Sequence, residues 1–261
     1  MTPWLEIIVP VRNPGVKLLE TGSSLAAQTE RGFSVVLSDN FSADGHDILM
    51  QFCDAMKSAN IPVNRVQPPY GLGRVQHCNW VHGQGEAEWL KPLFTGDLLK
   101  PDYMEHLHLR VAARPQAQIV RCEAEVNTAE KIRVSAAAPF KQENLTPTEF
   151  LNYFPTSGNW IGGLINVAYR RAAWQAVGGY PPHLPALGGL KLIAIMALRY
   201  GIEMIHEPLA ISQTHDDIRS NRCFETWLIL RELRNYCLSV NLPWPEFGVA
   251  RGVAGSFFGK F

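Results

Sequence analysis

Short apolar runs alternate with helical patterns through the first half of the chain, and this alternation restricts the fold more than any other feature. Residues 5–11 (LEIIVPV) are continuous and β-branched and end at the breaker RNPG, which predicts a buried strand. Further strands are expected at residues 33–39, 63–67 and 88–94, with helices over residues 16–28, 44–59 and 74–83. Strands that alternate with helices form right-handed βαβ units, so the sequence predicts a parallel sheet with both faces covered.

The second half has a different pattern. AQIVRCEAEV (117–126) and KIRVSAAAPF (131–140) are typical of strands with no helix between them, which predicts an antiparallel or mixed addition to the sheet. The polar, proline-containing segment 139–150 is expected to be a mobile connection, and helices are expected around 146–154, 170–177, 189–200 and 220–240. The expected fold class is therefore α/β, a Rossmann-related mixed sheet flanked by helices, with a C-terminal helical extension.

Composition and charge narrow the range of partners. The apolar fraction is 46% and the charged fraction 18%, as in folded globular proteins. The formal net charge is zero, so the protein has no overall positive potential that would attract nucleic acid. Five scattered cysteines without a C-x-x-C pair and an N-terminus unlike a signal peptide predict a cytoplasmic protein. The tail 241–261 mixes aromatic and basic residues; it is interpreted as a helix docked on the body, with peripheral contact at the inner face of a membrane as the alternative.

Ligands of open α/β sheets bind beyond the carboxyl ends of the strands, which directs attention to three loops: RNPG, SDNFSADG and TGDLLKP. In the second loop, Asp39 ends a strand and can accept hydrogen bonds from a ribose or a base, while Ser42 and Asp44 are expected to cap the next helix. No G-x-G-x-x-G follows the first strand, so a dinucleotide site is not indicated. His106 and His108 do not share a helix face and are interpreted as surface and packing residues.

Five segments in order resemble family 2 glycosyltransferases of GT-A fold. They are the opening IIVPVRNPGVKLLETGSSLAAQTERGFSVVLSDNFSADG, then GRVQHCNW, WLKPLFTGDLLKPDYMEHL, GNWIGGLINVAYRRAAWQAVGGY and EPLAISQTHDDIRSNR. The resemblance runs from about residue 5 to residue 222. It implies a GT-A-like domain over 1–222, with a nucleotide-binding half over about 1–112 and an acceptor half over about 113–222, followed by the extension 223–261.

The resemblance implies transfer of a sugar, with inversion, from a nucleotide-diphosphate sugar to a hydroxyl of a saccharide or lipid-linked acceptor, in polysaccharide or glycolipid assembly. Asp97 and His215 would hold Mg²⁺ or Mn²⁺ against the diphosphate, and Arg74 would bind phosphate oxygens. The full set of expected nucleotide-sugar-binding residues is Pro10, Arg12, Asn13, Asp39, Arg74, Asn79, Gly96, Asp97 and His215.

The chain departs from the family pattern at two places. Thr95 and Gly96 stand where the acidic loop would supply a second carboxylate beside Asp97, which weakens the metal site without excluding it. Gly188 and Gly189 stand where the family would place an acidic residue that deprotonates the acceptor, and a general base supplies about 10²–10⁴-fold in rate. Weak substitutes for that base are Asp216, Asp217 and Glu207.

Two functions from different classes stay open. The retained Asp39, Asp97 and His215 favour a working transferase, and the two glycines favour a catalytically silent relative that binds nucleotide-sugars or serves as a scaffold. A nucleotidyltransferase would need a glycine- and lysine-rich loop directly after the first strand, and RNPGVK matches that requirement poorly.

Overall fold

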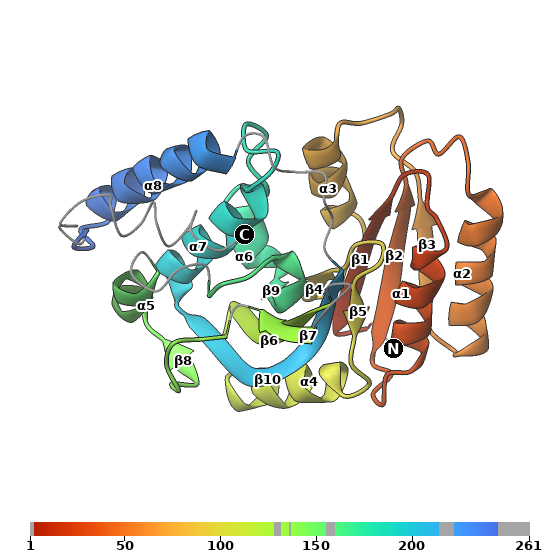
Figure 1. The fold of residues 1–261 in the computed structure, drawn as a ribbon, viewed down its shortest axis with the longest axis horizontal. Helices are drawn as coiled ribbons and strands as arrows, with labels where there is room; N and C mark the ends of the chain where they lie inside the picture. Colours follow the sequence, from red (N-terminus) through yellow and green to blue (C-terminus); the bar gives the residue numbers. More distant parts are fainter. Residues whose placement is uncertain (1–2, 128–131, 136, 155–159, 214–221, 245–261) are drawn as a thin grey trace.

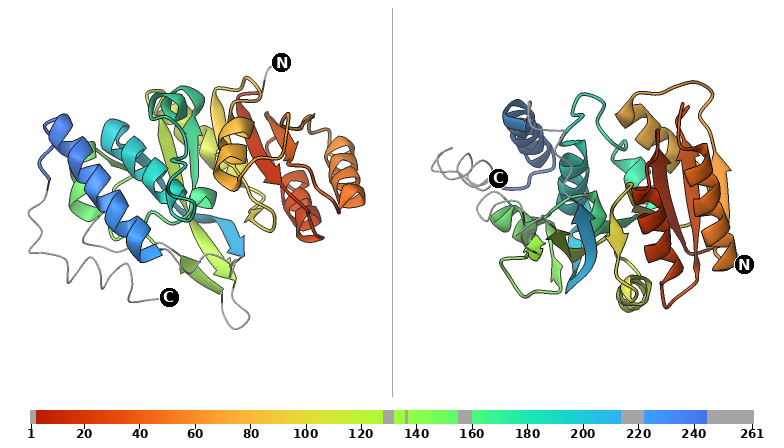
Figure 2. Two further views of the ribbon diagram at one scale, coloured as in Figure 1. Left: turned by 90° about the horizontal axis from the view of Figure 1, so that it is seen from above. Right: turned by 45° about the vertical axis from the view of Figure 1, so that its right-hand side comes forward.

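The computed structural model describes residues 3–127, 132–135, 137–154, 160–213 and 222–244. Within these residues ten strands form one mixed sheet in the order β3-β2-β1-β4-β9-β6-β10-β5, with β7 paired to β6 and β8 paired to β10. Helices cover both faces, and α2 and α8 lie at opposite ends of the molecule in every view (Figures 1 and 2). The α/β class with a mixed, helix-flanked sheet, expected from the sequence, is confirmed.

The nucleotide-binding half expected from the sequence forms the parallel end of this sheet. Its elements are β1 (Leu5–Val11), α1 (Lys17–Ala26), β2 (Phe33–Asp39), α2 (His46–Ser58), β3 (Val63–Val66), α3 (Arg74–His82) and β4 (Trp89–Pro92). β1 pairs in parallel with β2 on one side and with β4 on the other. The strand order 3-2-1-4 therefore reverses at β1, and a crevice opens at the carboxyl ends of β1 and β4.

The second half adds the antiparallel strands that the sequence predicted. Its elements are β5 (Leu98–Leu99), α4 (Tyr103–Ala113), β6 (Ile119–Asn127), β7 (Ile132–Ser135), β8 (Asn144–Leu145), α5 (Pro147–Tyr153), the 3₁₀ turn η1 (Leu164–Asn166), β9 (Val167–Arg170), α6 (Arg171–Ala176), α7 (Gly188–Tyr200), β10 (Ile202–Gln213) and α8 (Arg222–Ser239). β9 runs antiparallel to both β4 and β6, whereas β10 runs parallel to β6. β9 thus joins the parallel end of the sheet to the remainder.

The helix expected around 146–154 is confirmed as α5, but two sequence-based expectations about loops are wrong. Segment 139–150, expected as a mobile connection, contains β8 and the start of α5, which Thr146 caps by accepting a hydrogen bond from the Glu149 amide at 3.3 Å. The Glu149 carboxylate in turn accepts a hydrogen bond from the Thr146 amide at 2.8 Å, which completes a capping box. Helix α2 is preceded by Gly45 at φ +86° with no side-chain cap, so Ser42 and Asp44 do not cap it.

Buried side chains form one core on each face of the sheet. Along β1, Ile8 packs with the helices of one face, and Ile7 and Val9 pack with α1, α2 and α4 on the other. Ile229 and Leu233 of α8 belong to the Ile8 core and are at most 2% exposed, so α8 packs on the body of the protein. The tail beyond residue 244 lies outside the described residues. No helix in the described part is long and apolar enough to cross a bilayer.

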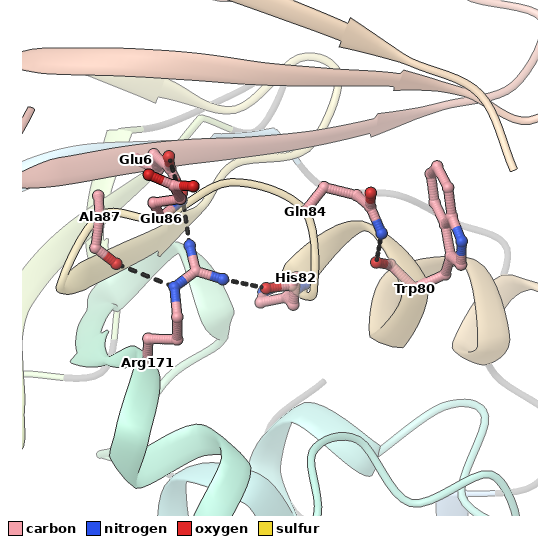
Figure 3. A network of polar contacts seen from close by, with 7 residues as sticks. All are labelled: Glu6, Trp80, His82, Gln84, Glu86, Ala87 and Arg171. Carbon is pink, nitrogen blue, oxygen red and sulfur yellow. Dashed lines mark hydrogen bonds and ion pairs between the residues drawn. The ribbon is translucent and has the colours of Figure 1, made fainter. Parts of the chain in front are cut away.

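A buried ion pair ties the first strand to the second half of the chain (Figure 3). Arg171 at the start of α6 donates from Nη2 to Glu6 Oε2 of β1 at 2.5 Å. Its other nitrogens donate to the carbonyls of Ala87 at 2.9 Å and His82 at 2.7 Å. Glu6 also accepts from the Glu86 amide at 3.0 Å. These contacts fix the connection between α3 and β4, the strand from which one loop of the crevice leaves.

Candidate functional site

A pocket of about 550 Å³ opens at the crevice between β1 and β4. Segments from both halves of the chain line it: the ends of β1 and β4, the start of α3, the η1 region, the turn before α7 and the end of β10. Its lining residues are Pro10, Arg12, Arg74, Val75, Cys78, Phe94, Thr95, Asp97, Gly162, Gly163, Leu164, Ile165, Tyr180, Leu184, Pro185, Ala186, Leu187, Gly188, Gly189, Leu190 and Ser212. The pocket thus lies where ligands of open α/β sheets bind.

Asp97 is held in this pocket by a tight turn after β4. Gly96 adopts φ +92°, which favours glycine, and donates its amide to Thr21 Oγ1 of α1 at 2.9 Å. Thr21 in turn donates to the Asp97 carbonyl at 3.1 Å, so one threonine of α1 fixes the loop. The Asp97 side chain is 5% exposed, and Ser212 of β10 lies with Oγ 3.4 Å from Asp97 Oδ1. The carboxylate therefore joins the β4 loop to the end of β10.

Arg12 and Arg74 bring positive charge to the same pocket. Arg12 follows β1, and Arg74 is the first residue of α3. Both are exposed, and neither forms an ion pair with any side chain in the described part of the chain. Two arginines beside one carboxylate give the described lining a net charge of plus one, which favours an anionic ligand.

Lys91 of β4 is fully buried near this site. Its Nζ donates to the carbonyls of Ile165 and Val167, the latter at 3.3 Å, and lies 5.2 Å from the centre of the Tyr103 ring. Burial lowers the pKa of Lys91 to about 8, and the nearby Cys122 and Asp97 oppose part of that decrease.

Because its folded pKa lies below the ordinary 10.5, Lys91 makes stability depend on pH. Between pH 8 and 10.5 the unfolded chain holds a proton that the folded protein has released, so stability from this group rises with pH. Relative to Lys91→Met, the wild type should gain about 3 kcal/mol of unfolding free energy across this window. Urea unfolding of both proteins at several pH values measures the difference. A difference that does not change with pH would contradict the assigned buried ammonium.

Besides Gly96, three expected site residues in the described part of the chain lie outside the lining, and two of them shape the loops after β1 and β2. Asp39 Oδ1 accepts from the Ser42 amide at 3.1 Å and from Ser42 Oγ at 2.5 Å. Asn13 donates its amide to Ser42 Oγ and accepts from the Ala43 amide, each at 2.8 Å. The loops after β1 and β2 are therefore joined, and Asp39 Oδ2 accepts no hydrogen bond from the described residues.

The third, Asn79, connects α3 to Tyr180, another residue of the pocket lining. Its Nδ2 donates to the Tyr180 carbonyl and its Oδ1 accepts from the Tyr180 amide, each at 2.8 Å. Both ends of the amide are thus used within the protein. Glu207 is exposed, lies on β10 next to an irregularity in the pairing with β6, and does not line the pocket. His215, Asp216 and Asp217 lie outside the described residues.

Lining residues from η1, the turn before α7 and the start of α7 are apolar, and we call this set the apolar wall. It comprises Leu164, Leu184, Pro185, Ala186, Leu187, Gly188, Gly189 and Leu190. Sequence reasoning placed Gly188 and Gly189 at the acceptor, and the structure places both in this wall. It missed the support behind the wall: Glu225 of α8 is 3% exposed and accepts from the amides of Ala186 at 3.1 Å and Leu187 at 2.7 Å.

The two glycines of the apolar wall tolerate a side chain differently. A Cβ on Gly189 would lie 2.8 Å from Leu164 Cγ, whereas a Cβ on Gly188 would meet its nearest neighbour, Pro181 Cδ, at 3.4 Å. We expect Gly189→Ala to cost about 1–3 kcal/mol of stability through overpacking. Gly188→Ala, the matched control, should be neutral or slightly stabilising, since alanine restricts the unfolded chain. Denaturant unfolding tests this, and equal effects of the two would contradict the predicted contact.

The metal ligands that the described lining residues could supply suit a divalent cation only when a nucleotide is bound as well. In the described part of the chain no three His, Cys, Asp or Glu side chains gather into a metal site. Asp97 is the one carboxylate among the described lining residues. Mg²⁺ beside nucleotides is usually held by one or two carboxylates together with phosphates and water. Asp97 fits that arrangement if a diphosphate supplies further ligands.

The architecture matches solved structures of the GT-A type. S. aureus TarS 1-349 in complex with UDP-GlcNAc superposes with a TM-score of 0.72 at 15% identity, over 94% of this chain and 68% of that chain. The mannosyltransferase PcManGT from Pyrobaculum calidifontis, with GDP-Man and Mn²⁺, superposes with a TM-score of 0.59 at 16% identity, over 92% of this chain and 65% of that chain. No protein-family profile and no curated protein matches the chain. The likeness confirms the GT-A fold predicted from the sequence.

Proposed function

We propose that this protein is a glycosyltransferase of family 2 that binds a nucleotide-diphosphate sugar and transfers the sugar with inversion. The observation that supports this most is the pocket at the β1–β4 crevice, where Arg12 and Arg74 have no ion-pair partner in the described chain. Structures of similar fold hold UDP-GlcNAc or GDP-Man, and a nucleotide-sugar diphosphate carries the negative charge that these arginines favour. Polysaccharide or glycolipid assembly would be the biological setting.

Each part of the donor would meet a different segment of the crevice. Pro10, Arg12 and Asn13 would border the nucleoside, and Asp39 would offer Oδ2 to the ribose or the base. Asp97 would be the protein ligand of a Mg²⁺ or Mn²⁺ ion, which when bound neutralises charge on the leaving diphosphate. Arg74 lines the pocket at the start of α3 and would bind phosphate oxygens. His215 would complete this set as in the family pattern.

Thermal unfolding with nucleotides tests the donor site. Purified protein is heated with UDP, GDP, CDP or dTDP and their common sugars, each with Mn²⁺ and with EDTA. A ligand that binds only the folded state at 100 times its Kd adds about 2.7 kcal/mol, which raises Tm by a few degrees. We expect one nucleotide class to raise Tm. No increase with any of them would refute the donor site.

The silent nucleotide-sugar binder remains the second candidate, because the apolar wall holds Gly188 and Gly189 and no carboxylate. Turnover separates the two functions. Consumption of the bound donor in the presence of an acceptor would identify an enzyme, whereas a Tm increase without consumption of any donor would favour the silent binder.

A further inference from the structure

Helix α8 exposes large apolar side chains on its outer side, where a surface helix is ordinarily polar. Its inner side packs on the body through Ile229, Leu233 and Cys237, which are at most 2% exposed. On the outer side Trp227 is 55% exposed and Leu238 is 53% exposed. The helix lies at one end of the molecule (Figure 1), so its outer side is open to a large partner.

These two apolar side chains belong to one stripe along the helix. Arg231 and Arg234 lie between them, and positions 227, 231, 234 and 238 follow one another at intervals of four, three and four residues. Such intervals bring side chains onto one face of an α-helix. Both arginines are exposed, and the Arg231 guanidinium lies 4.9 Å from the centre of the Trp227 ring. We call these four residues the outer stripe; it holds two cations between an aromatic and an aliphatic side chain.

The positive charge of the outer stripe is not balanced by the described glutamates of α8, because both are engaged with the body. Glu225 is 3% exposed and accepts from the Ala186 amide at 3.1 Å. Glu232 pairs with Lys191 of α7 and with His183 Nε2, the latter at 2.8 Å. Since the formal net charge of the whole protein is zero, the stripe is a local positive site on a neutral molecule.

This combination of charge and apolar surface does not suit a second copy of the chain. The centre of the stripe lies between Arg231 and Arg234. A two-fold contact brings the same patch of both subunits together, so two antiparallel α8 helices meeting at this centre would place arginine opposite arginine. Like charges at such a contact oppose association, and the charge complementarity of the stripe therefore favours an anionic partner.

A bilayer with anionic headgroups satisfies every side chain of the outer stripe. Arginine guanidinium groups pair with lipid phosphates, and aromatic rings such as that of Trp227 settle at the level of the headgroups. The apolar side of a surface-lying helix enters the boundary between headgroups and acyl chains, where Leu238 would also be buried. An acidic protein surface would match the two cations but would leave the exposed apolar residues less well covered.

We propose that the outer stripe of α8 is a docking site for an anionic lipid surface, with the helix lying parallel to the membrane plane. This inference uses no residue of the pocket lining and does not depend on the proposed function. It assigns membrane contact to α8 and not to the tail 241–261, where the sequence analysis kept peripheral contact as an alternative. Two cations and two apolar side chains give reversible binding, not stable anchoring.

Vesicle flotation with the full chain tests the proposal. Purified protein is mixed with vesicles of phosphatidylcholine alone, or of equal parts phosphatidylcholine and phosphatidylglycerol, and the bound fraction gives a partition coefficient. We expect binding to the mixed vesicles that weakens as salt is added, and little binding to phosphatidylcholine. Equal binding to both would remove the role of charge. Binding to neither would overturn the proposal and leave the stripe to an acidic protein surface.

Variants of the stripe make the test specific. Arg231→Ala combined with Arg234→Ala should lower the partition coefficient about 25-fold, since each arginine near an anionic surface contributes about fivefold. Trp227→Ala should lower it about tenfold through lost apolar burial. Arg231→Lys combined with Arg234→Lys should bind as the wild type does, because lipid attraction depends on charge. Loss of binding in the lysine variant would indicate a partner that requires the guanidinium shape and would contradict the proposal.

Two control pairs locate the binding surface. Arg31→Ala with Arg65→Ala removes the same charge from exposed arginines at the parallel end of the sheet, away from α8, and should leave binding unchanged. An equal loss in this pair would show that overall charge, not the stripe, drives binding. If Arg251→Ala with Lys260→Ala abolishes binding while the alanine variants of α8 retain it, the tail is the lipid-binding element and the proposal is wrong. Far-UV circular dichroism checks that each variant is folded.

Discussion

Replacing Arg171 with methionine is expected to cost about 3–5 kcal/mol of unfolding free energy, because it leaves the Glu6 carboxylate buried without its cation. The side chains of Glu6 and Arg171 are 8% and 14% exposed, and the guanidinium also binds the carbonyls of Ala87 and His82. Guanidinium chloride unfolding measures the loss. The partner variant Glu6→Gln in the Arg171→Met background should recover part of it, since no charge then remains buried.

A pair at the surface supplies the control for this prediction. Arg110 donates to Glu143 at 2.8 Å, but the Glu143 side chain is 66% exposed. Solvent screens such pairs, so Glu143→Gln should change stability little. A comparable effect from Glu143→Gln and Arg171→Met would show that the ion pair of Glu6 and Arg171 is solvated in solution.

Asp97→Ala is expected to remove metal-dependent nucleotide binding while the protein remains folded. Asp97 is the described carboxylate of the pocket, so without it a divalent cation would have only phosphates and water as ligands from that side. The Tm increase caused by the preferred nucleotide with Mn²⁺, worth about 2.7 kcal/mol at 100 times Kd, should disappear. Far-UV circular dichroism checks that the fold is kept.

Two further variants make the result specific. Asp97→Asn keeps the shape of the side chain and an oxygen that can accept from Ser212. If this variant also loses metal-dependent nucleotide binding, the negative charge of Asp97 is what the binding requires. Asp102→Ala removes a carboxylate of the same loop region that is 49% exposed and pairs only loosely with His106 at 3.7 Å, and it should bind as the wild type does. An unchanged Tm increase in Asp97→Ala would exclude Asp97 as a metal ligand.

The parallel half of the fold could be predicted because each buried strand is a compact apolar run between breakers. β2 spans Phe33–Asp39 as expected, since both of its faces are buried and FSVVLSD ends at a polar turn. Segment 139–150 was misjudged only in part: the helix that begins in it was expected, but the two-residue strand β8 is too short to show a strand pattern. Thr146, Pro147 and Glu149 have the spacing of a capping box with proline at the first helical position, which indicates a helix start.

The site was only partly readable from sequence. The charged lining residues follow strands or begin a helix at the carboxyl edge of the sheet: they are Arg12, Arg74 and Asp97. Ligands of open α/β sheets bind at that edge, so the predicted strand ends were enough to place these residues near a ligand site. The apolar wall is assembled from η1, the turn before α7 and the support of α8, and no local pattern links these segments. Glu225 and Glu232 lie seven residues apart on α8, on either side of the buried Ile229. That spacing places both carboxylates on the packed side of the helix, a signal that could have indicated partners in the body.

The place of β9 in the sheet has a consequence for synthesis on the ribosome. β4 pairs with β1 through residues that are made early, but its other neighbour is β9, which begins only at Val167. At about 5–20 residues per second, several seconds pass before that strand can emerge. During this interval the nascent N-terminal part of the sheet exposes the outer edge of β4, a row of unpaired backbone groups that can pair with other chains. Productive folding in the cell therefore depends on how well that edge is shielded until β9 has been made and can pair with β4.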